Sequence, residues 1–395
     1  MPQVRARQRH RVAATALVVS AGLLLAACTQ ASARSDKTSA SSAAPVSPAA
    51  SVAAASSAQA LASSASAAAL AAGVSGATGA SPGVSSAPPP VLSGIDPLTG
   101  LPPTSPTAEK RPALAVKIDN VQGAWPQAGL NQADIVYDLP VEGGLTRLLA
   151  IFHSADVPVI GPIRSARPVD ADILHLLGHS YFAFSGGTSS DLGPINDHSN
   201  ATPMWWDVTP SLFVIRHDHA VPHQVFGTTA MLYAGGEARS PSTTPPPPMF
   251  SYQVAVPTNA VPTNAVPATT VTAQYSAATA AWTWNGTQYL RNQSGHPDLL
   301  IGGAQVSATN VVVMSVGVKN TSAHDSHGTV VPLPVVIGSG QVWVFRNGVV
   351  VHGTWSRPNE NSPMKLVATT GQVIPLMPGR TWVEVLPNSS LPKIG

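Results

Sequence analysis

The chain contains a single cysteine, Cys28, so no intramolecular disulfide can hold its folded parts together. Four arginines at positions 5 to 11 and an apolar stretch over 12–27 come before this residue. A charged start, a short apolar middle and small residues before a cleavage point are typical of a secretory signal. We therefore expect an extracytoplasmic protein whose folded domains depend on their hydrophobic cores.

Residues 25–28 read Leu-Ala-Ala-Cys, which resembles the lipobox of bacterial lipoproteins, in which the thiol is alkylated by diacylglycerol. The apolar stretch of about 16 residues is shorter than the roughly 20 residues that cross a bilayer as a helix. We predict that residues 1–27 are removed as a signal peptide and that Cys28 anchors the protein to the membrane through its lipid. The alternative is a plain secretory signal with a cysteine near its cleavage site.

Residues 28–93 consist almost wholly of small side chains, and no charge lies between Lys37 and Asp96. Such a segment has little surface to bury, so we predict a disordered tether. Charged residues make up 10% of the chain, and the formal net charge is +2. This weak field gives no electrostatic basis for nucleic-acid binding. Because ordinary domains carry about 25% charged residues, each charge in the folded region is expected to have a defined place.

The remainder divides into two predicted domains. Residues 94–236 alternate strand patterns with one helix, which indicates an α+β or α/β domain. Residues 237–269 form a predicted linker with a Val-Pro-Thr-Asn-Ala repeat, and residues 270–390 a mainly antiparallel β domain. The predicted helix is 170–179, and the predicted strands are 113–118, 134–139, 146–153, 181–184, 212–216, 271–275, 281–284, 310–318, 330–337, 341–345, 349–355 and 381–386.

Several long motifs resemble the two domains of YerB-like bacterial lipoproteins. In the first half these are residues 96–101, 127–137, 141–147 and 161–168; in the second half they are residues 289–291, 310–313, 338–340, 353–355 and 374–382. The resemblance covers nearly all of 95–388 and implies a lipid-anchored envelope protein with two such domains. It implies no catalytic residues. Pro222-His223-Gln224 differs from the family's usual Pro-His-Asn. The five-residue repeat resembles an insertion relative to the family.

The densest charged motif contains Arg164 and Arg167, followed by Asp170 and Asp172. Two guanidinium groups in a turn can hold a phosphate or carboxylate through paired hydrogen bonds, and a following helix adds its dipole. The alternative, which is slightly favoured, is that the arginines pair with Glu142, Asp170 or Asp172 and lock the domain.

Glu142 and Arg147 flank a Gly-Gly turn. Glu142 is the best general-base candidate in this charge-poor region, and the two glycines would let a ligand approach the backbone closely. A carboxylate that caps neighbouring amides is the more common use of such a residue. Residues 185–190 follow a strand and form only a weak candidate for an anion-binding nest, because a Walker lysine is absent.

Arg216 and three histidines, His217, His219 and His223, form the richest histidine cluster. Alternate residues on a strand point the same way, so His217 and His219 could bind zinc with His223 as a third ligand. A polar binding site at His223 and a solvated loop are both favoured over this metal site. We predict no metal site and no cofactor.

Two functions follow. The preferred one is a lipid-anchored envelope protein that binds an anionic or glycan-like envelope ligand, or an envelope protein, near Glu142, Arg147, Arg164, Arg167, Asp170, Arg216 and His223. The alternative is an envelope hydrolase of glycan or phosphodiester bonds. In it Glu142 or Asp170 serves as acid/base, His223 shuttles a proton and the arginines stabilise negative charge.

Overall fold

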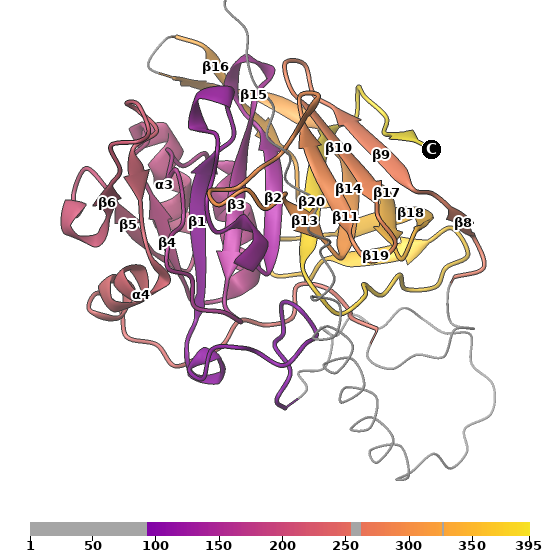
Figure 1. Cartoon of the computed structure of the whole chain (residues 1–395), viewed down its shortest axis with the longest axis horizontal. Helices are drawn as coiled ribbons and strands as arrows, with labels where there is room; N and C mark the ends of the chain where they lie inside the picture. The colour runs from indigo at the N-terminus through magenta and orange to yellow at the C-terminus, as the bar shows by residue number, and fades with distance from the viewer. Residues whose placement is uncertain (1–92, 254–261, 326–327) are drawn as a thin grey trace, which may run out of the picture. The chain divides into compact units, whose positions relative to one another are not determined.

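Strands from both halves of the chain build one large mixed sheet (Figure 1). The computed structural model describes residues 93–253, 262–325 and 328–395, so the predicted signal peptide, Cys28 and residues 28–92 of the predicted tether lie outside it. Among the described residues the large sheet has 11 strands in the order β19-β18-β17-β14-β20-β2-β3-β1-β4-β5, with β8 paired to β18. Its strands are β1 (Ala113–Asp119), β2 (Ile135–Pro140), β3 (Thr146–Phe152), β4 (Ser180–Phe184), β5 (Ala201–Trp205), β8 (Ala265–Pro267), β14 (Asn310–Val316), β17 (Gly338–Arg346), β18 (Val349–Arg357), β19 (Lys365–Ala368) and β20 (Thr381–Pro387).

Helices cover both faces of the sheet in the N-terminal half. These are α2 (Val169–Leu174), α3 (Ser189–His198) and α4 (Thr229–Glu237). Ile173 of α2 and Ile195 of α3 belong to the core on one face, whereas Leu232 of α4 belongs to the core on the other. A strand covered on both faces needs a continuous apolar run, and every residue of β1 is accordingly buried.

A second sheet covers the large sheet in the C-terminal half (Figure 1). Val271, Trp282 and Tyr289 of this sheet pack in one core with Val311 and Phe345 of the large sheet. Its order is β12-β11-β10-β9-β21, with β13 paired to β11. The strands are β9 (Thr270–Gln274), β10 (Thr279–Trp284), β11 (Tyr289–Gln293), β12 (His296–Pro297), β13 (Ser307–Ala308) and β21 (Lys393–Ile394).

Two hairpins complete the described fold. The first joins β6 (Val214–Ile215) to β7 (Val225–Phe226), and the second joins β15 (Val318–His324) to β16 (Val330–Pro334). The predicted α+β or α/β first domain and mainly antiparallel second domain agree with the structure in general terms: the first half has a mixed sheet with few helices, and antiparallel strands predominate in the second half. None of the described helices is long and apolar enough to cross a membrane.

The described parts of the predicted linker pack against the fold. Met249 and Phe250 are buried in the core, and the Gln253 amide donates to the carbonyl of Leu376 at 2.7 Å. The end of the repeat forms β8, which pairs with β18. The first part of the repeat lies outside the described residues, and the boundaries 94–236, 237–269 and 270–390 stay predictions.

The strand directions decide where the charged residues meet. Strands β1, β4 and β5 are mutually parallel, as are β2, β20 and β14, whereas β3 is antiparallel to both β1 and β2. All six parallel strands therefore end at one edge, which we call the carboxyl edge. In open sheets ligands bind at this kind of edge.

Candidate functional site

The carboxyl edge gathers most of the charged residues that the sequence singles out. Asp119 ends β1, Glu142 follows β2 in the short 3₁₀ helix η4 (Glu142–Gly144), and Arg147 lies near the start of β3, paired in register with Asp119. Arg164 reaches the same edge because its amide donates to the Lys117 carbonyl and its carbonyl accepts from Ser185, each bond linking it to a neighbouring strand end. Sequence positions far apart are thus brought together by the sheet.

Lys117 and Asp170 form a fully buried ion pair beneath this edge. The Lys117 Nζ lies 2.6 Å from the Asp170 Oδ1, and neither side chain is exposed. Burial lowers the pKa of Lys117 below its ordinary range, against the opposing effect of Asp170. The other Asp170 oxygen accepts from the Arg167 amide at 2.7 Å. Both Asp170 oxygens are therefore occupied by partners within the protein.

Arg167 is enclosed by acidic groups. Its Nε donates to Glu142 Oε1, its Nη1 lies 3.8 Å from Asp191 Oδ2, and the Glu142 and Arg167 side chains are only 6% and 7% exposed. Arg167 therefore pairs with Glu142, which is the favoured one of the two predicted uses of this arginine. Arg164 takes a different partner from those expected.

Arg164 and His223 share Asp119. The Arg164 Nε and the His223 Nδ1 each lie 3.0 Å from Asp119 Oδ2, on a carboxylate that is itself buried. Burial opposes ionisation of Asp119, but the His223 hydrogen bond and the positive charges of Arg147 and Arg164 lower its pKa below the ordinary value. Asp119 is therefore an anion that holds the partly exposed side chains of Arg164 and His223, which are 27% and 14% exposed.

Arg147 has only a backbone partner among the hydrogen bonds found: its Nη1 donates to the Ser165 carbonyl at 3.2 Å. Burial and the neighbouring charge of Arg167 lower its pKa to about 10. Its side chain is half-buried and lies among the same charges as Arg164. A guanidinium with spare donors is what an oxyanion would require.

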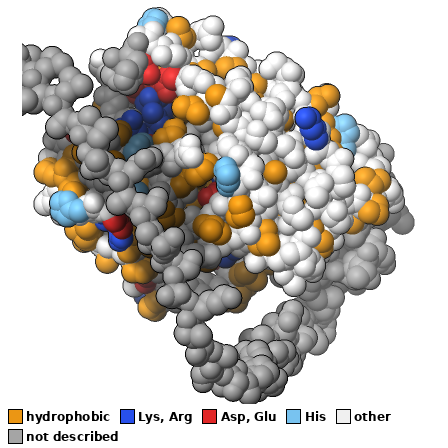
Figure 2. Space-filling model, turned by 45° about the horizontal axis from the view of Figure 1, so that its top comes forward, with side chains coloured by type: hydrophobic (Ala, Val, Ile, Leu, Met, Phe, Trp, Pro, Cys, Tyr) orange, Lys and Arg blue, Asp and Glu red, His pale blue; other side chains and the backbone are white. Residues whose placement is uncertain are grey.

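Arg147, Arg164 and His223 form what we call the arginine surface. The carboxylates near these side chains, Asp119 and Glu142, are buried. Figure 2, which turns the upper end of the molecule forward, shows blue and red side chains gathered in one part of a face that is otherwise mostly uncharged. Exposed Asp207, beside Gly186, limits the arginine surface on the β5 side.

The glycine turn after Glu142 is used by the protein itself. A Cβ on Gly144 would lie 2.6 Å from the Ser276 Cβ, and the Gly144 carbonyl accepts from the Ala277 amide at 2.9 Å. Gly144 thus serves packing against the second half, whereas nothing lies within 4 Å of a Cβ added to Gly143. Residues 188–191 likewise form a capping box, in which Asp191 accepts from the Thr188 amide. This carboxylate therefore takes the place of an external anion at the candidate nest over 185–190.

The histidine motif separates in space. His223 joins the arginine surface, whereas His219 lies between Asp218 and the Pro126 carbonyl, each 3.1 Å away. Arg216 binds Asp218 through Nε at 3.0 Å and lies over the Phe226 ring. Arg216 therefore sits in the neighbouring hairpin with its own partner, and the described residues include no cluster of three metal-ligating side chains.

Three residues of the charge cluster are not among the predicted site residues: Lys117, Asp119 and Asp191. Each has a signal in the sequence. A lysine inside an otherwise apolar strand implies a buried partner, and Asp119 stands where a buried strand ends. Asp191 follows Thr188 by three residues, which is the capping-box spacing.

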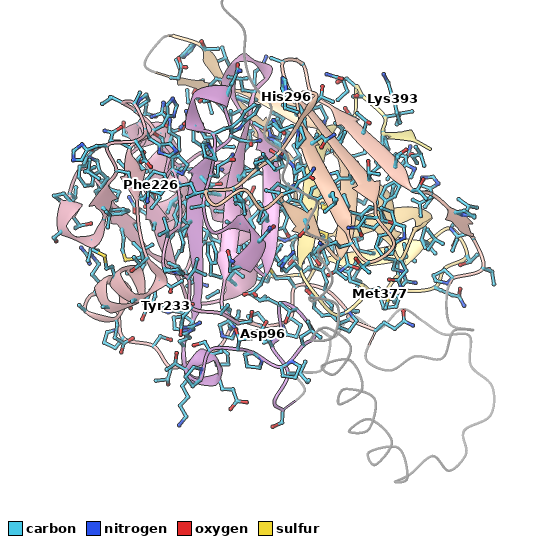
Figure 3. All side chains as sticks on the ribbon, in the orientation of Figure 1. Asp96, Phe226, Tyr233, His296, Met377 and Lys393 are labelled. Carbon is cyan, nitrogen blue, oxygen red and sulfur yellow. The ribbon has the colours of Figure 1, made fainter. Side chains whose placement is uncertain are left out.

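A second buried polar cluster lies at the opposite edge of the sheet, where Figure 3 marks Asp96. His153 Nδ1 pairs with Asp96, and Asp134 accepts from the Ser154 amide at 3.0 Å. Burial, with the nearby charge of Asp96, raises the pKa of Asp134 to about 7. The His153 Nε2 faces the Arg111 carbonyl and not Ser154, so no nucleophile–base pair is formed.

The fold and this edge define a mixed-sheet protein with a charge cluster at its parallel strand ends. The chain belongs to the YerB-like family: residues 98–242 and 270–383 match the N- and C-terminal domains described as "Protein of unknown function (DUF3048)". It is 26% identical over 308 residues to the Bacillus subtilis (strain 168) protein named "Putative lipoprotein YerB", covering 74% of this chain and 86% of that protein. The crystal structure of Bacillus subtilis YerB shares the fold, with a TM-score of 0.62, 21% identity and coverage of 76% of this chain and 99% of that one.

Proposed function

We propose that this protein is a lipid-anchored, extracytoplasmic envelope protein whose arginine surface binds an anionic group of an envelope ligand, such as the phosphate or carboxylate of a glycan polymer. The proposal needs no cofactor. Two features outside the described residues motivate the anchor: the signal-like segment and Cys28. The relative's name, which includes the word lipoprotein, agrees with it.

One observation carries the binding proposal: two guanidinium groups, neither fully buried, lie beside the buried carboxylates Asp119 and Glu142, with exposed Asp207 at the margin of the surface. Asp119 holds Arg164, Glu142 holds Arg167, and the half-buried side chains of Arg147 and Arg164 keep hydrogen-bond donors to spare. A preformed pair of guanidinium groups loses little conformational freedom when it binds an oxyanion. The carboxyl end of parallel strands is also a favoured place for ligands.

The hydrolase alternative has weaker support. It requires a free carboxyl group at Glu142 or Asp170, within reach of a proton on the substrate. Asp170 is fully buried against Lys117, and Glu142 is held by Arg167 with 6% of its side chain exposed. Both carboxylates are thereby occupied as partners of buried cations.

The binding proposal is tested by titrating the purified full-length chain with fluorescent poly(glycerol phosphate). Arg164→Gln and Arg147→Gln should each weaken binding about tenfold, because each removes a charge-assisted hydrogen bond of about 1.5 kcal/mol. Arg239→Gln is the matched control, since Arg239 is an exposed arginine at the end of α4 that donates to the Gly235 carbonyl. Equal affinity for all four proteins would overturn the proposal.

The anchor is tested separately by replacing Cys28. The variant Cys28→Ser keeps the size of the side chain and removes the thiol that would carry the lipid. We expect the wild-type chain in the membrane fraction and the variant released from it, with loss of incorporated labelled fatty acid. Membrane association and labelling that persist in the variant would exclude Cys28 as the anchor and leave the binding proposal intact.

A further inference from the structure

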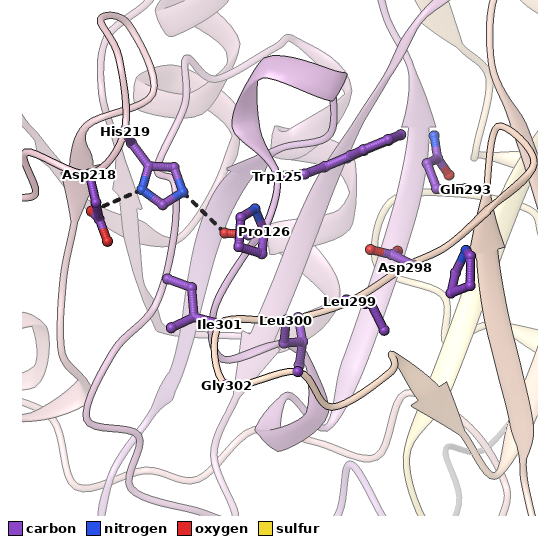
Figure 4. Close-up of a pocket in the computed structure, with 12 residues that line it drawn as sticks. Trp125, Pro126, Asp218, His219, Gln293, Asp298, Leu299, Leu300, Ile301 and Gly302 are labelled. Atoms are coloured by element: carbon purple, nitrogen blue, oxygen red, sulfur yellow. Dashed lines mark hydrogen bonds and ion pairs between the residues drawn. The ribbon is translucent and has the colours of Figure 1, made fainter. Parts of the chain in front are cut away.

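A second candidate site lies beside the arginine surface, in a cavity of about 550 Å³. Its walls come from Trp125 and Pro126 after β1, from Asp218 and His219 in the β6–β7 hairpin, and from residues 297–303 of the second half (Figure 4). Cavities of roughly 300–1,000 Å³ with mainly apolar walls and a few polar groups are typical of small-molecule sites. The cavity therefore has the size of a small ligand.

The walls are fixed by hydrogen bonds within the protein. The Ile301 amide donates to the Gln127 carbonyl at 2.8 Å, and buried Asp298 is held by Arg291. On the opposite wall His219 is held between Asp218 and the Pro126 carbonyl, as the dashed lines in Figure 4 mark. The cavity does not need to be organised by its ligand.

Two polar atoms of the walls are buried without a hydrogen-bond partner. One is the indole Nε1 of Trp125, a donor, and the other is the Oε1 of Gln293, an acceptor on a side chain that is only 2% exposed. Figure 4 shows the indole directed toward Gln293. Leaving such groups unpaired is unfavourable, so an unpaired donor and an unpaired acceptor on two side chains that line one cavity point to a ligand that satisfies both.

The remaining walls narrow the class of ligand. No lysine or arginine lines the cavity; Asp298 is neutralised by Arg291, and Leu299, Leu300 and Ile301 are apolar. An anion therefore gains nothing there. A secondary amide with a methyl group offers one acceptor for Trp125, one donor for Gln293 and an apolar end for the leucines. Exposed Asp218 at the rim can accept from hydroxyl groups.

We propose that this cavity binds an uncharged N-acetylated sugar, with its acetamido group between Trp125 and Gln293. The indole would then lie against the apolar side of the sugar ring, a common use of a half-exposed tryptophan. The inference does not rest on the arginine surface, because the sugar carries no charge. The proposal thus gives a function to a cavity that is lined by residues of both halves of the chain.

The test is an NMR titration of the purified full-length chain with N,N′-diacetylchitobiose, followed through the indole N–H resonance of Trp125. That resonance is assigned by its absence in Trp125→Phe. We expect it to shift with saturation at millimolar concentrations, whereas cellobiose, which lacks the acetamido groups, should bind about tenfold more weakly. No shift, or equal affinity for cellobiose, would overturn the proposal.

Variants complete the test. Gln293→Leu removes the unpaired acceptor at similar volume, so it should weaken binding of the disaccharide about tenfold while leaving the thermal stability unchanged or raised. Trp284→Phe is the matched control, since Trp284 packs on Tyr289 away from the cavity. Arg164→Gln should leave sugar binding unchanged, which separates this proposal from the anion site. Binding retained in Gln293→Leu would place the sugar elsewhere and contradict the assignment.

Discussion

At the scale of single residues, several carboxyl groups are buried more deeply than their charge would allow in isolation. Glu384 is fully buried, accepts from the Trp282 indole at 2.9 Å and lies 2.8 Å from the Tyr275 hydroxyl. Burial, reinforced by the nearby charge of Asp138, raises its pKa from 4.5 to about 8. Glu384 therefore holds a proton in the folded protein at neutral pH.

This proton gives stability an unusual pH dependence. The unfolded chain releases it near pH 4.5 and the folded chain only near pH 8, so the folded state binds more protons between these values. The free energy of unfolding should then fall as pH rises through this window, by about 1.4 kcal/mol per pH unit for one group. Denaturant unfolding of wild type and Glu384→Gln between about pH 5 and pH 8 measures the difference. A difference that stays constant with pH would contradict the buried proton.

The Lys117–Asp170 pair gives a second prediction at this scale. Both side chains are fully buried, so Asp170→Asn leaves an uncompensated charge and should lower the free energy of unfolding by about 3–5 kcal/mol. Asp172→Asn is the control on the same helix, because Asp172 is only half-buried; it should change stability by less than about 0.5 kcal/mol. Equal effects at both positions, measured by chemical denaturation, would show that the pair has no special role.

Much of the candidate site was predictable residue by residue, but its pairing was not. Glu142, Arg164, Arg167 and His223 were selected because charges are scarce in this chain, and the sheet does bring them to one edge. The pairing of these side chains depends on the order of the strands in the sheet. The spacing of residues along the sequence does not determine that order. Gln293 could not be selected, because a glutamine in a strand gives no sign that its oxygen is unpaired.

At the scale of elements, apolar strands were predictable and polar or interrupted elements were not. The predicted strands over 113–118, 341–345 and 381–386 agree with β1, β17 and β20. Helix α3 was missed because Gly193 and Pro194 interrupt its pattern. Strand β5 was missed because it contains Pro203; as the outermost strand of the sheet it tolerates a residue without an amide hydrogen.

Helix α4 contains two adjacent glycines, Gly235 and Gly236, a pair that is unfavourable for helix formation. A Cβ on Gly236 would lie 2.4 Å from the Tyr181 ring, so this position needs glycine for close packing against β4. Gly236→Ala should therefore destabilise the protein by about 1–3 kcal/mol, despite the better helix propensity of alanine. The measurement is the free energy of unfolding in urea.

The matched control for Gly236 is Gly193 of α3, where an added Cβ meets nothing within 4 Å. Gly193→Ala should leave stability unchanged or raise it by up to about 1 kcal/mol. If both alanine variants changed stability in the same direction, the close approach of α4 to Tyr181 would not be the determining factor.

At the scale of the whole molecule, the large sheet ties the two halves together. Strand β2 pairs in parallel with β20, and the buried Arg291 of β11 binds Asp138 of β2 at 2.5 Å. Neither contact can be inferred from local patterns, since 153 residues separate Asp138 from Arg291. The composition change after residue 237 indicates a domain boundary in the sequence. The hydrogen bonds between β2 and β20 nevertheless join the two sides of that boundary.

We therefore predict that the two halves unfold together. Differential scanning calorimetry of the full-length chain should give one transition, with calorimetric and van't Hoff enthalpies that agree. Arg291→Met should lower the temperature of that single transition, because it strands the buried carboxylates of Asp138 and Asp298. Two separate transitions in the wild-type protein would contradict a cooperative sheet.

At the carboxyl edge, buried Asp119 pairs with Arg164 and His223, and half-buried Arg147 lies among the same charges with donors to spare; we propose that an anion binds there. The most direct measurement is a crystal structure of the protein soaked in selenate, whose selenium identifies the anion by anomalous scattering. We predict bound selenate, identified by its selenium peak, whose oxygens lie within hydrogen-bond distance of the Arg147 and Arg164 side chains, and its loss in Arg164→Gln. An arginine surface free of selenate in the wild-type crystal, with no neighbouring molecule covering it, would contradict the account.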